Sequence, residues 1–408
     1  MITEMTQRLI QWCEVNSGSD HLEGLDRMLG ILEEAFDELP GEAERLDLPP
    51  MREFLADGTT ALFPVGKAYR RRCRPEAPLQ VLLCGHMDTV FGRDHPFQKA
   101  ALDAENGILN APGAVDMKGG LLVMFYALRA FERSLHPNIG WEILIVPDEE
   151  IGSLSSGSLL IEAAKRNHVG LVFEPSLPDG SLVRSRQGLG TFNAVVHGRA
   201  AHAGRDFLEG RSAIVALSEF IQRIHALNDE IPDAVFNAGR IQGGGAVNIV
   251  PDRAAAQFNV RVSSLTTIPE VTARLESVIA EMNSREGISV DWEGGFTRPP
   301  KIAGPAEAIL FDQIRALAAE NGEVLQWKNT GGASDGNNLA AAGLPNIDTL
   351  GPCGGNLHND REFVELASLP RRIRLVERLL LEWSANGLPP GVMREMRKVD
   401  KGRRKSFW

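Results

Sequence analysis

Short apolar runs that end in polar residues constrain the fold of this chain most strongly. The segments 78–88 (PLQVLLCGHMD), 140–150 (GWEILIVPDEE) and 169–176 (VGLVFEPS) indicate strands, and segments with helical spacing of apolar residues separate them. Strand–helix–strand alternation with apolar strands predicts an α/β fold with a mainly parallel sheet that helices cover on both faces. Ligands of such sheets bind beyond the carboxyl ends of the strands.

The middle of the chain has a different pattern. Its order is an alternating strand, a helix, two alternating strands, a helix and a strand, which predicts a split β-α-β domain. A chain of 408 residues is long enough for two domains. We therefore expect a discontinuous main domain formed by residues 1–186 and 298–388, an inserted domain at 187–297, and a basic C-terminal tail at 389–408.

Composition excludes several classes of protein. The chain is 43% hydrophobic and 24% charged, which is typical of a soluble globular protein. A net charge of −11 argues against a nucleic-acid-binding protein, and no stretch is long and apolar enough to predict a membrane span. From Arg394 onward the tail has seven Lys or Arg residues against two acids, which we interpret as a solvated, frayed end.

The cysteines and the N-terminus indicate the compartment. Cys13, Cys73, Cys84 and Cys353 lack the spacing of a metal site, and four cysteines in this length do not make a disulfide framework. The first twelve residues read as an amphipathic helix and not as a signal peptide. We therefore expect a reducing, cytoplasmic location.

Acidic and imidazole residues collect in loops that follow the predicted strands. Desolvating them together would be costly unless cations compensate their charge. Imidazole and carboxylate groups without thiolates favour zinc or a similar ion in a catalytic site. Such a set suits two metals about 3.5–4 Å apart, which can hold a water molecule and lower its pKa. The candidate ligands are His86, Asp116, Glu150, Glu174 and His358.

Several motifs together resemble a known family. They are GHMDTV, GAVDMKGG, PDEEIGS, HGRAAHAG, GGASDGNN and the histidine of NLHND. On these motifs, over nearly the whole chain to about residue 388, the chain resembles the zinc-dependent aminoacylase/carboxypeptidase superfamily. That superfamily includes glutamate carboxypeptidase, acetylornithine deacetylase and succinyl-diaminopimelate desuccinylase. The resemblance implies an α/β zinc domain with an inserted ferredoxin-like lid or dimerisation domain.

The resemblance also implies roles at the metal centre. Asp116 would bridge the metals, His86 and Glu174 would hold one, and Glu150 and His358 the other. Glu149 would be the general base, because a neighbouring carboxylate that is not fixed on a metal is free to carry protons. The peptide bond after Asp116 would be cis. Asp88, two residues after His86, can accept the imidazole N–H and fix its tautomer.

On the substrate side, the resemblance implies that His202 reaches the neighbouring protomer's site and stabilises an oxyanion. Asn248 would contact substrate, and Arg261 and Arg298 would bind a substrate carboxylate through bidentate pairs. Taken without the resemblance, His202 is a surface histidine, Asn248 a turn asparagine and Arg261 an exposed strand arginine.

Two further acids have structural interpretations. In GGASDGNN the helix that Ser334 and Asp335 open could help to bind an anion, but we favour a capping role for Asp335. Asp148, the first acid of the DEE cluster, is interpreted as a turn or supporting residue.

The resemblance implies a homodimer, and the inserted domain, which has no room for a second β-α-β-β-α-β unit, favours that state. The sequence as a whole therefore predicts a metal-dependent amidohydrolase. The substrate would be a small N-acyl amino acid or peptide with a free carboxylate. A glutamate-carboxypeptidase-like activity is the first choice. An N-acyl-amino-acid deacylase is the alternative. The cofactor would be two divalent ions, zinc before cobalt or manganese. A non-catalytic metal-binding relative and a purely structural oligomer are the competing classes.

Overall fold

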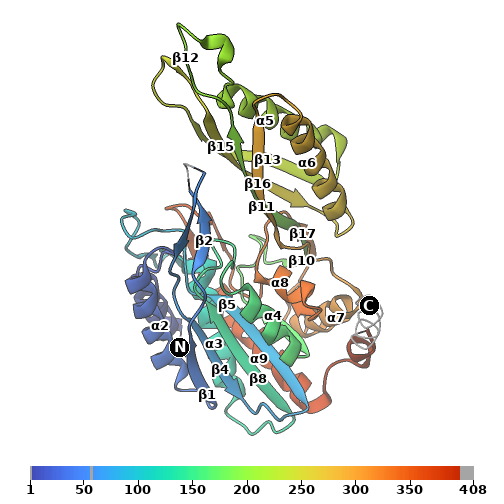
Figure 1. Cartoon of the computed structure of the whole chain (residues 1–408). Helices are drawn as coiled ribbons and strands as arrows, with labels where there is room; N and C mark the ends of the chain where they lie inside the picture. Colours follow the sequence, from blue (N-terminus) through green and yellow to red (C-terminus); the bar gives the residue numbers. More distant parts are fainter. Residues whose placement is uncertain (1, 56–57, 396–408) are drawn as a thin grey trace.

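The computed structural model describes residues 2–55 and 58–395. The chain forms a main domain and an inserted domain at 188–298 that stands on one end of it (Figure 1). The inserted domain begins with one strand and ends with its neighbour in the same sheet. Leu189 of the first strand lies opposite Arg298, the final residue of the last strand. Arg298 therefore lies at the junction of the two domains.

The main domain is built around a mixed sheet of six strands in the order β1-β4-β8-β5-β9-β18. β8, β5, β9 and β18 run parallel, whereas β1 and β4 pair antiparallel at one edge. The mixed, mainly parallel sheet that the sequence predicts is therefore confirmed. The strands are β1 (Glu42–Leu46), β4 (Ala68–Cys73), β5 (Leu79–His86), β8 (Ile139–Val146), β9 (Val169–Val172) and β18 (Asn346–Ile347).

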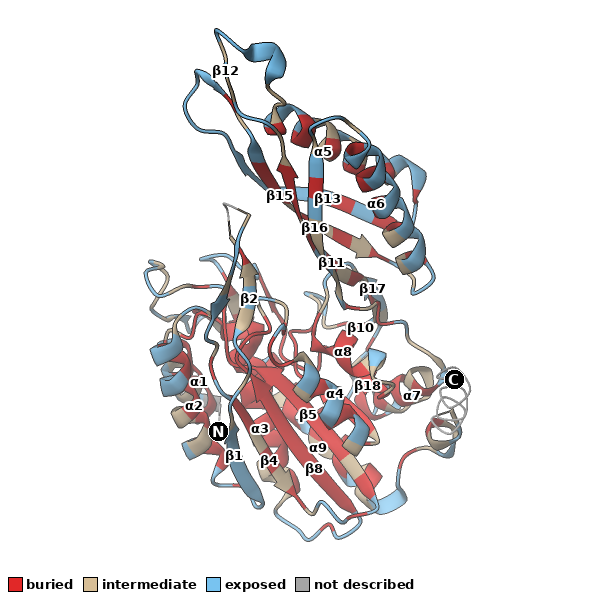
Figure 2. Cartoon of the chain, viewed as in Figure 1, coloured by how far each residue is buried: buried red, intermediate tan, exposed pale blue. Residues whose placement is uncertain are grey.

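Helices cover both faces of this sheet, so that β5 and β8 are buried along their length (Figure 2). Successive side chains of β5 point to opposite faces of the sheet: Val81 belongs to the larger core and Leu82 to the smaller one. The larger core holds α1 (Ile2–Cys13), α2 (Leu22–Phe36), α3 (Gly119–Phe131), α7 (Pro305–Ala319) and α9 (Ser368–Asn386). The smaller core lies under α4 (Gly157–Arg166) and α8 (Asp335–Ala341).

The inserted domain has an antiparallel sheet in the order β13-β15-β11-β16. Two helices pack on one face of it around Phe192, Phe220 and Phe258. Its elements are β11 (Gly188–His197), α5 (Ala213–Glu230), β13 (Ala234–Gly243), β15 (Arg253–Val262), α6 (Thr267–Asn283) and β16 (Ser289–Arg298). The short strands β12 (Ala201–His202) and β14 (Ile249–Val250) pair near its far end, beside the turn η2 (Phe207–Glu209) (Figure 1).

A hairpin that the sequence patterns did not predict reaches from the main domain to the inserted domain. It consists of β2 (Met51–Phe54) and β3 (Thr60–Phe63). Its Phe54 packs against Val195 and Ala255 of the inserted sheet, and the Phe54 carbonyl accepts a hydrogen bond of 3.3 Å from Gln257. The hairpin therefore forms a wall between the domains.

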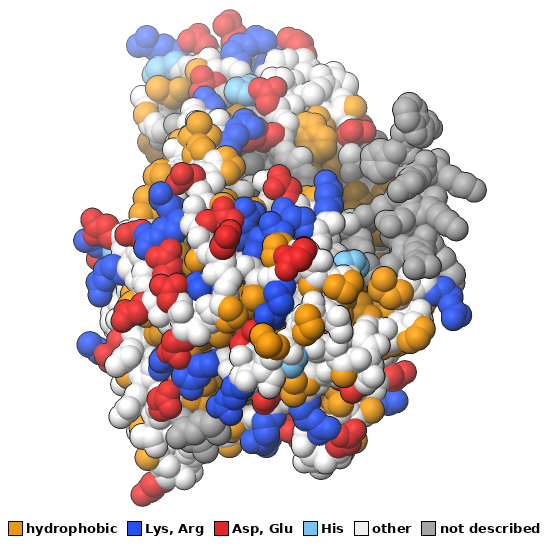
Figure 3. All heavy atoms as spheres, turned by 90° about the horizontal axis from the view of Figure 1, so that it is seen from below, with side chains coloured by type: hydrophobic (Ala, Val, Ile, Leu, Met, Phe, Trp, Pro, Cys, Tyr) orange, Lys and Arg blue, Asp and Glu red, His pale blue; other side chains and the backbone are white. Residues whose placement is uncertain are grey.

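The remaining strands form small sheets around the main domain. β6 (Ala101–Asp103), β7 (Ile108–Asn110), β20 (Phe363–Glu365) and β19 (Gly354–Gly355) form one sheet, and β10 (Leu182–Arg186) pairs with β17 (Trp327–Thr330). Among the described residues, no helix combines the length and the apolar character needed to cross a membrane. Acidic and basic side chains are interspersed on the face shown in Figure 3.

The first residues of the predicted basic tail pack on the main domain. Residues 390–395 are helical, and the buried Val392 belongs to the larger core. The rest of the predicted basic tail, 396–408, lies outside the described residues.

Candidate metal centre and active site

Three of the predicted site segments leave the sheet at one edge. His86 is the last residue of β5, Glu149 and Glu150 follow β8, and Glu174 follows β9. These strands run parallel, so their carboxyl ends meet at the same edge. The imidazole Nε2 of His86 lies 3.9 Å from a carboxylate oxygen of Glu174.

Asp116 lies between the two histidines. It belongs to the short segment η1 (Ala114–Lys118), which precedes α3, and its peptide bond to Met117 is cis, as the resemblance implies. Its Oδ1 lies 3.2 Å from Nε2 of His86, and its Oδ2 lies 3.4 Å from Nε2 of His358. Each oxygen of the carboxylate therefore faces a different imidazole, which is the arrangement that a bridging ligand needs.

His358 comes from the loop between β19 and β20. Its Nε2 lies 3.2 Å from Oε2 of Glu150. The donor atoms form two groups, one from His86, Asp116 and Glu174 and one from Asp116, Glu150 and His358. Within each group the atoms lie within 4.8 Å of one another. The structure thus brings the five predicted ligands together in the predicted grouping, with Asp116 in both groups.

The electrostatics of the cluster fit cations. Burial, followed by the charge of Asp116, raises the pKa of Glu150 to about 8, and burial raises the pKa of Glu174 well above its usual range. Hydrogen bonds to Asp116 and Glu150 raise the pKa of His358 to about 10. All three shifts favour the protonated forms, as expected for a buried group of carboxylates that lacks compensating positive charge. Two divalent ions on the same donor atoms would provide that compensation.

Asp88 contacts both His86 and the segment that contains Glu149 and Glu150. The Nδ1 of His86 lies 3.0 Å from the Asp88 carbonyl oxygen and 3.3 Å from its Oδ1. Both oxygens only accept, so Nδ1 carries a proton and Nε2 faces the centre. The Asp88 carboxylate also accepts hydrogen bonds from the amides of Glu149 (3.2 Å) and Glu150 (3.1 Å) and from the hydroxyl of Ser19 (2.8 Å).

Glu362 supports the centre, although the sequence analysis did not single it out. It is buried, and its carboxylate accepts hydrogen bonds from the amides of Gly113 (3.0 Å), Val115 (2.9 Å) and Asp116 (3.0 Å). It lies four residues after His358, so it ties the His358 loop to the Asp116 segment. Its position in NLHNDRE is the signal that could have suggested this role.

Glu149 lies outside both groups of donor atoms and is held by Arg298. The Nη2 of Arg298 is 2.9 Å from Oε1 of Glu149, and it also donates to the Glu149 carbonyl (2.9 Å) and the Ser153 hydroxyl (2.7 Å). Only 4% of the Arg298 side chain is exposed. Arg298 therefore contacts the predicted base, which the sequence analysis did not anticipate.

The capping role favoured for Asp335 is wrong. The N-cap of α8 is Ser334, whose hydroxyl accepts from the Gly336 amide at 3.1 Å. Asp335 is the first helical residue, and its Oδ1 accepts from the hydroxyl of Ser153 and lies 3.4 Å from Arg298. The buried charge of Arg298 explains why Asp335 turns inward.

A second buried ion cluster supports the glycine-rich loop at 331–334. Arg186 binds Asp348 through two hydrogen bonds of 2.7 and 3.0 Å, and its Nη1 donates to the Gly332 carbonyl at 3.1 Å. Arg261 of β15 donates to the Gly331 carbonyl at 2.6 Å. Arg261 and Arg298 are therefore brought to either end of this loop.

His202 and Asn248 lie together near the far end of the inserted domain. The carbonyl of Asn248 accepts from the Ala203 amide at 2.9 Å, and both side chains are exposed. Figure 1 places β12, which contains His202, away from the main domain. The structure does not bring these two residues to the metal centre of their own chain.

Asp148 has the turn role that the sequence predicts. Its carboxylate accepts from the amides of Ser155 (2.9 Å) and Ser156 (3.2 Å), and its carbonyl accepts from the Ser153 amide (2.7 Å). It thereby fixes the segment that follows Glu150.

Comparisons with known proteins agree with this architecture. A model of peptidase family M20/M25/M40 matches residues 82–382. The chain is 30% identical to carboxypeptidase G2 of Pseudomonas sp. (strain RS-16) over 310 residues, 75% of this chain and 74% of that protein. It is 29% identical to the succinyl-diaminopimelate desuccinylase of Alkalilimnicola ehrlichii over 317 residues, 72% of this chain and 82% of that protein.

Solved structures show the same fold. A tripeptidase from Staphylococcus aureus has a TM-score of 0.73 and 20% identity, covering 95% of this chain and 99% of its own. An M20 family metallo-carboxypeptidase from Sulfolobus solfataricus has a TM-score of 0.73 and 17% identity, covering 94% and 99%. At these identities the likeness concerns the fold.

Proposed function

Because the chain belongs to peptidase family M20/M25/M40, we propose that it hydrolyses the amide bond of a small N-acyl amino acid or peptide. The substrate would carry a free carboxylate on the amine side, as for a glutamate-carboxypeptidase-like enzyme. One observation carries the proposal: two groups of donor atoms share Asp116, and Glu149 lies beside them but in neither. This arrangement separates metal binding from proton transfer.

We assign His86 and Glu174 to one ion, Glu150 and His358 to the other, and Asp116 to both. Zinc is our first choice because imidazole and carboxylate ligands suit it, and cobalt and manganese suit the same ligands. When bound, a pair of such ions would polarise the amide carbonyl and lower the pKa of a water molecule.

Glu149 is the general base in this proposal. Its carboxylate would accept the proton of the attacking water and deliver it to the leaving amine nitrogen. Asp88 supports this step through its hydrogen bond to the Glu149 amide, and it fixes the tautomer of His86.

The substrate carboxylate is assigned to the arginines around the glycine-rich loop. Arg261 is partly exposed and donates one N–H to the Gly331 carbonyl, so its remaining donors can form a charge-assisted pair. Arg298 is buried against Glu149 and Asp335. We propose that Arg261 binds the substrate carboxylate. Arg298 could do so only after its ion pair with Glu149 is broken.

A homodimer would give His202 and Asn248 a function. β13 is an edge strand of the inserted sheet and exposes Val235 and Ile241, and α5 exposes Ile214 and Val215. A two-fold interface along this edge would bury these side chains. We propose that each protomer supplies His202 and Asn248 to its partner's site, where His202 stabilises the oxyanion.

The second candidate is an N-acyl-amino-acid deacylase of the acetylornithine or succinyl-diaminopimelate type. This candidate is supported by the similarity to the desuccinylase of Alkalilimnicola ehrlichii, which extends over 82% of that protein. A hydrolysis screen of the zinc-loaded protein separates the two. It would compare N-acyl-glutamates, folate-like conjugates, dipeptides, N-acetylornithine and N-succinyl-diaminopimelate.

We also propose that the protein is located in the cytoplasm. Its four cysteines are free and buried. Burial raises the pKa of Cys13 to about 12 and that of Cys73 to about 11, which suits inert thiols in a reducing compartment. Fractionation of cells with an antibody against the chain would test this location.

A further inference from the structure

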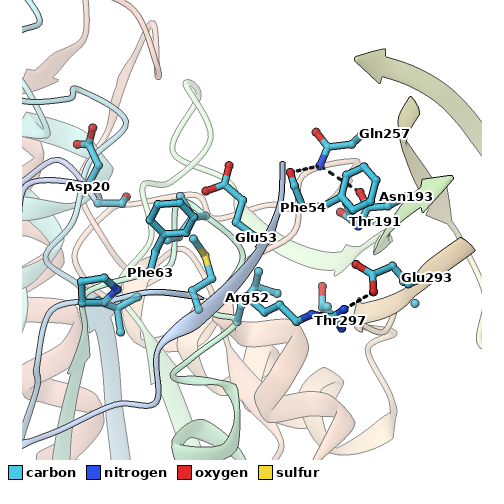
Figure 4. Close-up of a pocket in the computed structure, with 18 of the residues that line it drawn as sticks. Asp20, Arg52, Glu53, Phe54, Phe63, Thr191, Asn193, Gln257, Glu293 and Thr297 are labelled. Atoms are coloured by element: carbon cyan, nitrogen blue, oxygen red, sulfur yellow. Dashed lines mark hydrogen bonds and ion pairs between the residues drawn. The ribbon is translucent and has the colours of Figure 1, made fainter. Parts of the chain in front are cut away.

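A large cavity lies between the hairpin, the main domain and the inserted sheet (Figure 4). Its volume is about 880 Å³, which is within the range of ligand sites. Met51, Phe54 and Phe63 of the hairpin form one wall. Ile151 and Leu154 of the main domain also line the cavity, and the inserted domain contributes residues of β11, β15 and β16.

Two residues that line the cavity link it to the metal centre. Ile151, which lines it, is the residue after the candidate ligand Glu150. Ser19, which also lines it, donates a hydrogen bond of 2.8 Å to Asp88. A substrate whose amide lies at the metal centre could therefore extend one end into this cavity.

The walls of the cavity include large apolar side chains that are not buried. Phe63 is 38% exposed, Ile151 is 36% exposed and Leu154 is 47% exposed. Apolar surface of this kind, gathered in a concave site, favours an apolar occupant because contact removes it from water.

The charges around the cavity disfavour an anionic occupant. Asp20, Glu53 and Glu293 line it, against one cation, Arg52. Arg52 pairs with Glu293 at 2.6 Å, so its charge is already compensated. Arg261 and Arg298, which lie around the glycine-rich loop, are not among the cavity residues. The carboxylate end of a substrate and the end in this cavity thus have different chemical environments.

From these contacts we infer that the cavity between the β2–β3 hairpin and the inserted sheet binds the acyl side of the substrate, and that this acyl group is uncharged and either aromatic or bulky aliphatic. This inference rests on the proposed amidohydrolase function and specifies its substrate class. It distinguishes the chain from a desuccinylase, whose acyl group carries a carboxylate. Phe63 is then a specificity-determining residue.

The test compares kcat/KM of the zinc-loaded full chain for N-benzoyl-, N-acetyl- and N-succinyl-glutamate. We expect the benzoyl substrate to exceed the acetyl one by about 10-fold or more, with the succinyl substrate lowest. Phe63→Ala should reduce the benzoyl-to-acetyl ratio by about 10-fold. The matched control is Leu62→Ala, because Leu62 is the neighbouring hairpin residue, is 66% exposed and is not among the cavity residues.

Two results would overturn the inference while leaving the proposed function intact: a preference for the acetyl or succinyl substrate, or an unchanged ratio in folded Phe63→Ala. If no substrate of the panel is hydrolysed, the proposed activity fails for this substrate class and the cavity is tested by binding. Calorimetry would then compare N-benzoyl- with N-acetyl-glutamate on zinc-loaded Glu149→Gln with and without Phe63→Ala. Equal affinities in that experiment would refute the cavity assignment.

Discussion

The Nη2 atom of Arg298 lies 2.9 Å from Oε1 of Glu149, and the two side chains are buried against each other at the junction of the domains. Arg298 is the last residue of β16, so the inserted domain contributes directly to the position of the proposed base. Movement of the inserted domain would therefore also move a contact of Glu149.

This pair leads to a prediction about kinetics. Replacing Arg298 by Lys or Met should lower kcat by about 10- to 100-fold with little change in KM, because a displaced base loses part of its contribution. If Arg298 instead binds the substrate carboxylate in the free enzyme, KM would rise with kcat nearly unchanged. Arg315→Met, which removes an exposed pair with Asp312 on α7, serves as the control. Steady-state kinetics of the three variants decide between the roles.

Glu362 should govern metal affinity although it binds no metal. Glu362→Gln replaces one acceptor oxygen with an NH₂ group that faces backbone donors, so the segment around Asp116 loses part of its support. We expect zinc affinity to fall by about 10- to 100-fold. Competition with a chelator measures this affinity. Glu365→Gln is the control because Glu365, the half-buried last residue of β20, lies three residues further on. Equal affinities in Glu362→Gln and wild type would contradict this role.

Because of Asp348, the free energy of unfolding should depend on pH in the acid range. Burial alone would raise the pKa of its carboxyl, but the charges of Arg186 and Lys301 hold this pKa well below its usual range. A lowered folded-state pKa stabilises the protein above the unfolded value of about 4, and this stabilisation is lost as pH falls through the folded value.

The corresponding variant is Asp348→Asn, which leaves two buried cations poorly compensated. We expect it to lose about 3–5 kcal/mol at neutral pH. The difference from wild type should stay constant above about pH 5 and shrink below about pH 4. Urea unfolding across this range measures it, and a difference that grows towards acid pH would contradict the assignment.

His202 should act on the partner subunit. When Glu149→Ala and His202→Ala proteins are mixed and allowed to exchange subunits, each mixed dimer has one site with both functional side chains. Activity should then recover to about a quarter of wild type. If His202 acts within its own chain, every site lacks one group and the mixture stays inactive. Analytical ultracentrifugation confirms beforehand that dimers form.

Much of the fold could be predicted because burial imposes simple periodicities. The apolar run that ends at His86 became β5, and the segment Leu22–Phe36, whose apolar residues have helical spacing, forms α2. The strand order could not be read from these patterns, since it depends on which strands pair in space. The β2–β3 hairpin was missed because it is short and half exposed, and its contacts with Val195 and Ala255 come from a distant part of the sequence.

The candidate site was predictable to the extent that its residues follow strands or carry motifs. The five candidate ligands and Glu149 meet for that reason. The contacts of Arg298 and Asp335 were not predictable, because each is decided by a buried partner more than 30 residues away. The same is true of Glu362, whose three backbone donors lie about 250 residues earlier. Sequence spacing gives no information on such pairs.

The most direct test of the account is metal content measured together with activity in the wild type and in Glu149→Ala. After reconstitution with zinc, elemental analysis should find about two ions per chain in both proteins, and only the wild type should hydrolyse N-acyl-glutamates. This outcome would show that metal binding, by Asp116 and the four other ligands, is distinct from proton transfer by Glu149. One ion or none in the reconstituted wild type, or activity that survives in Glu149→Ala, would contradict the account.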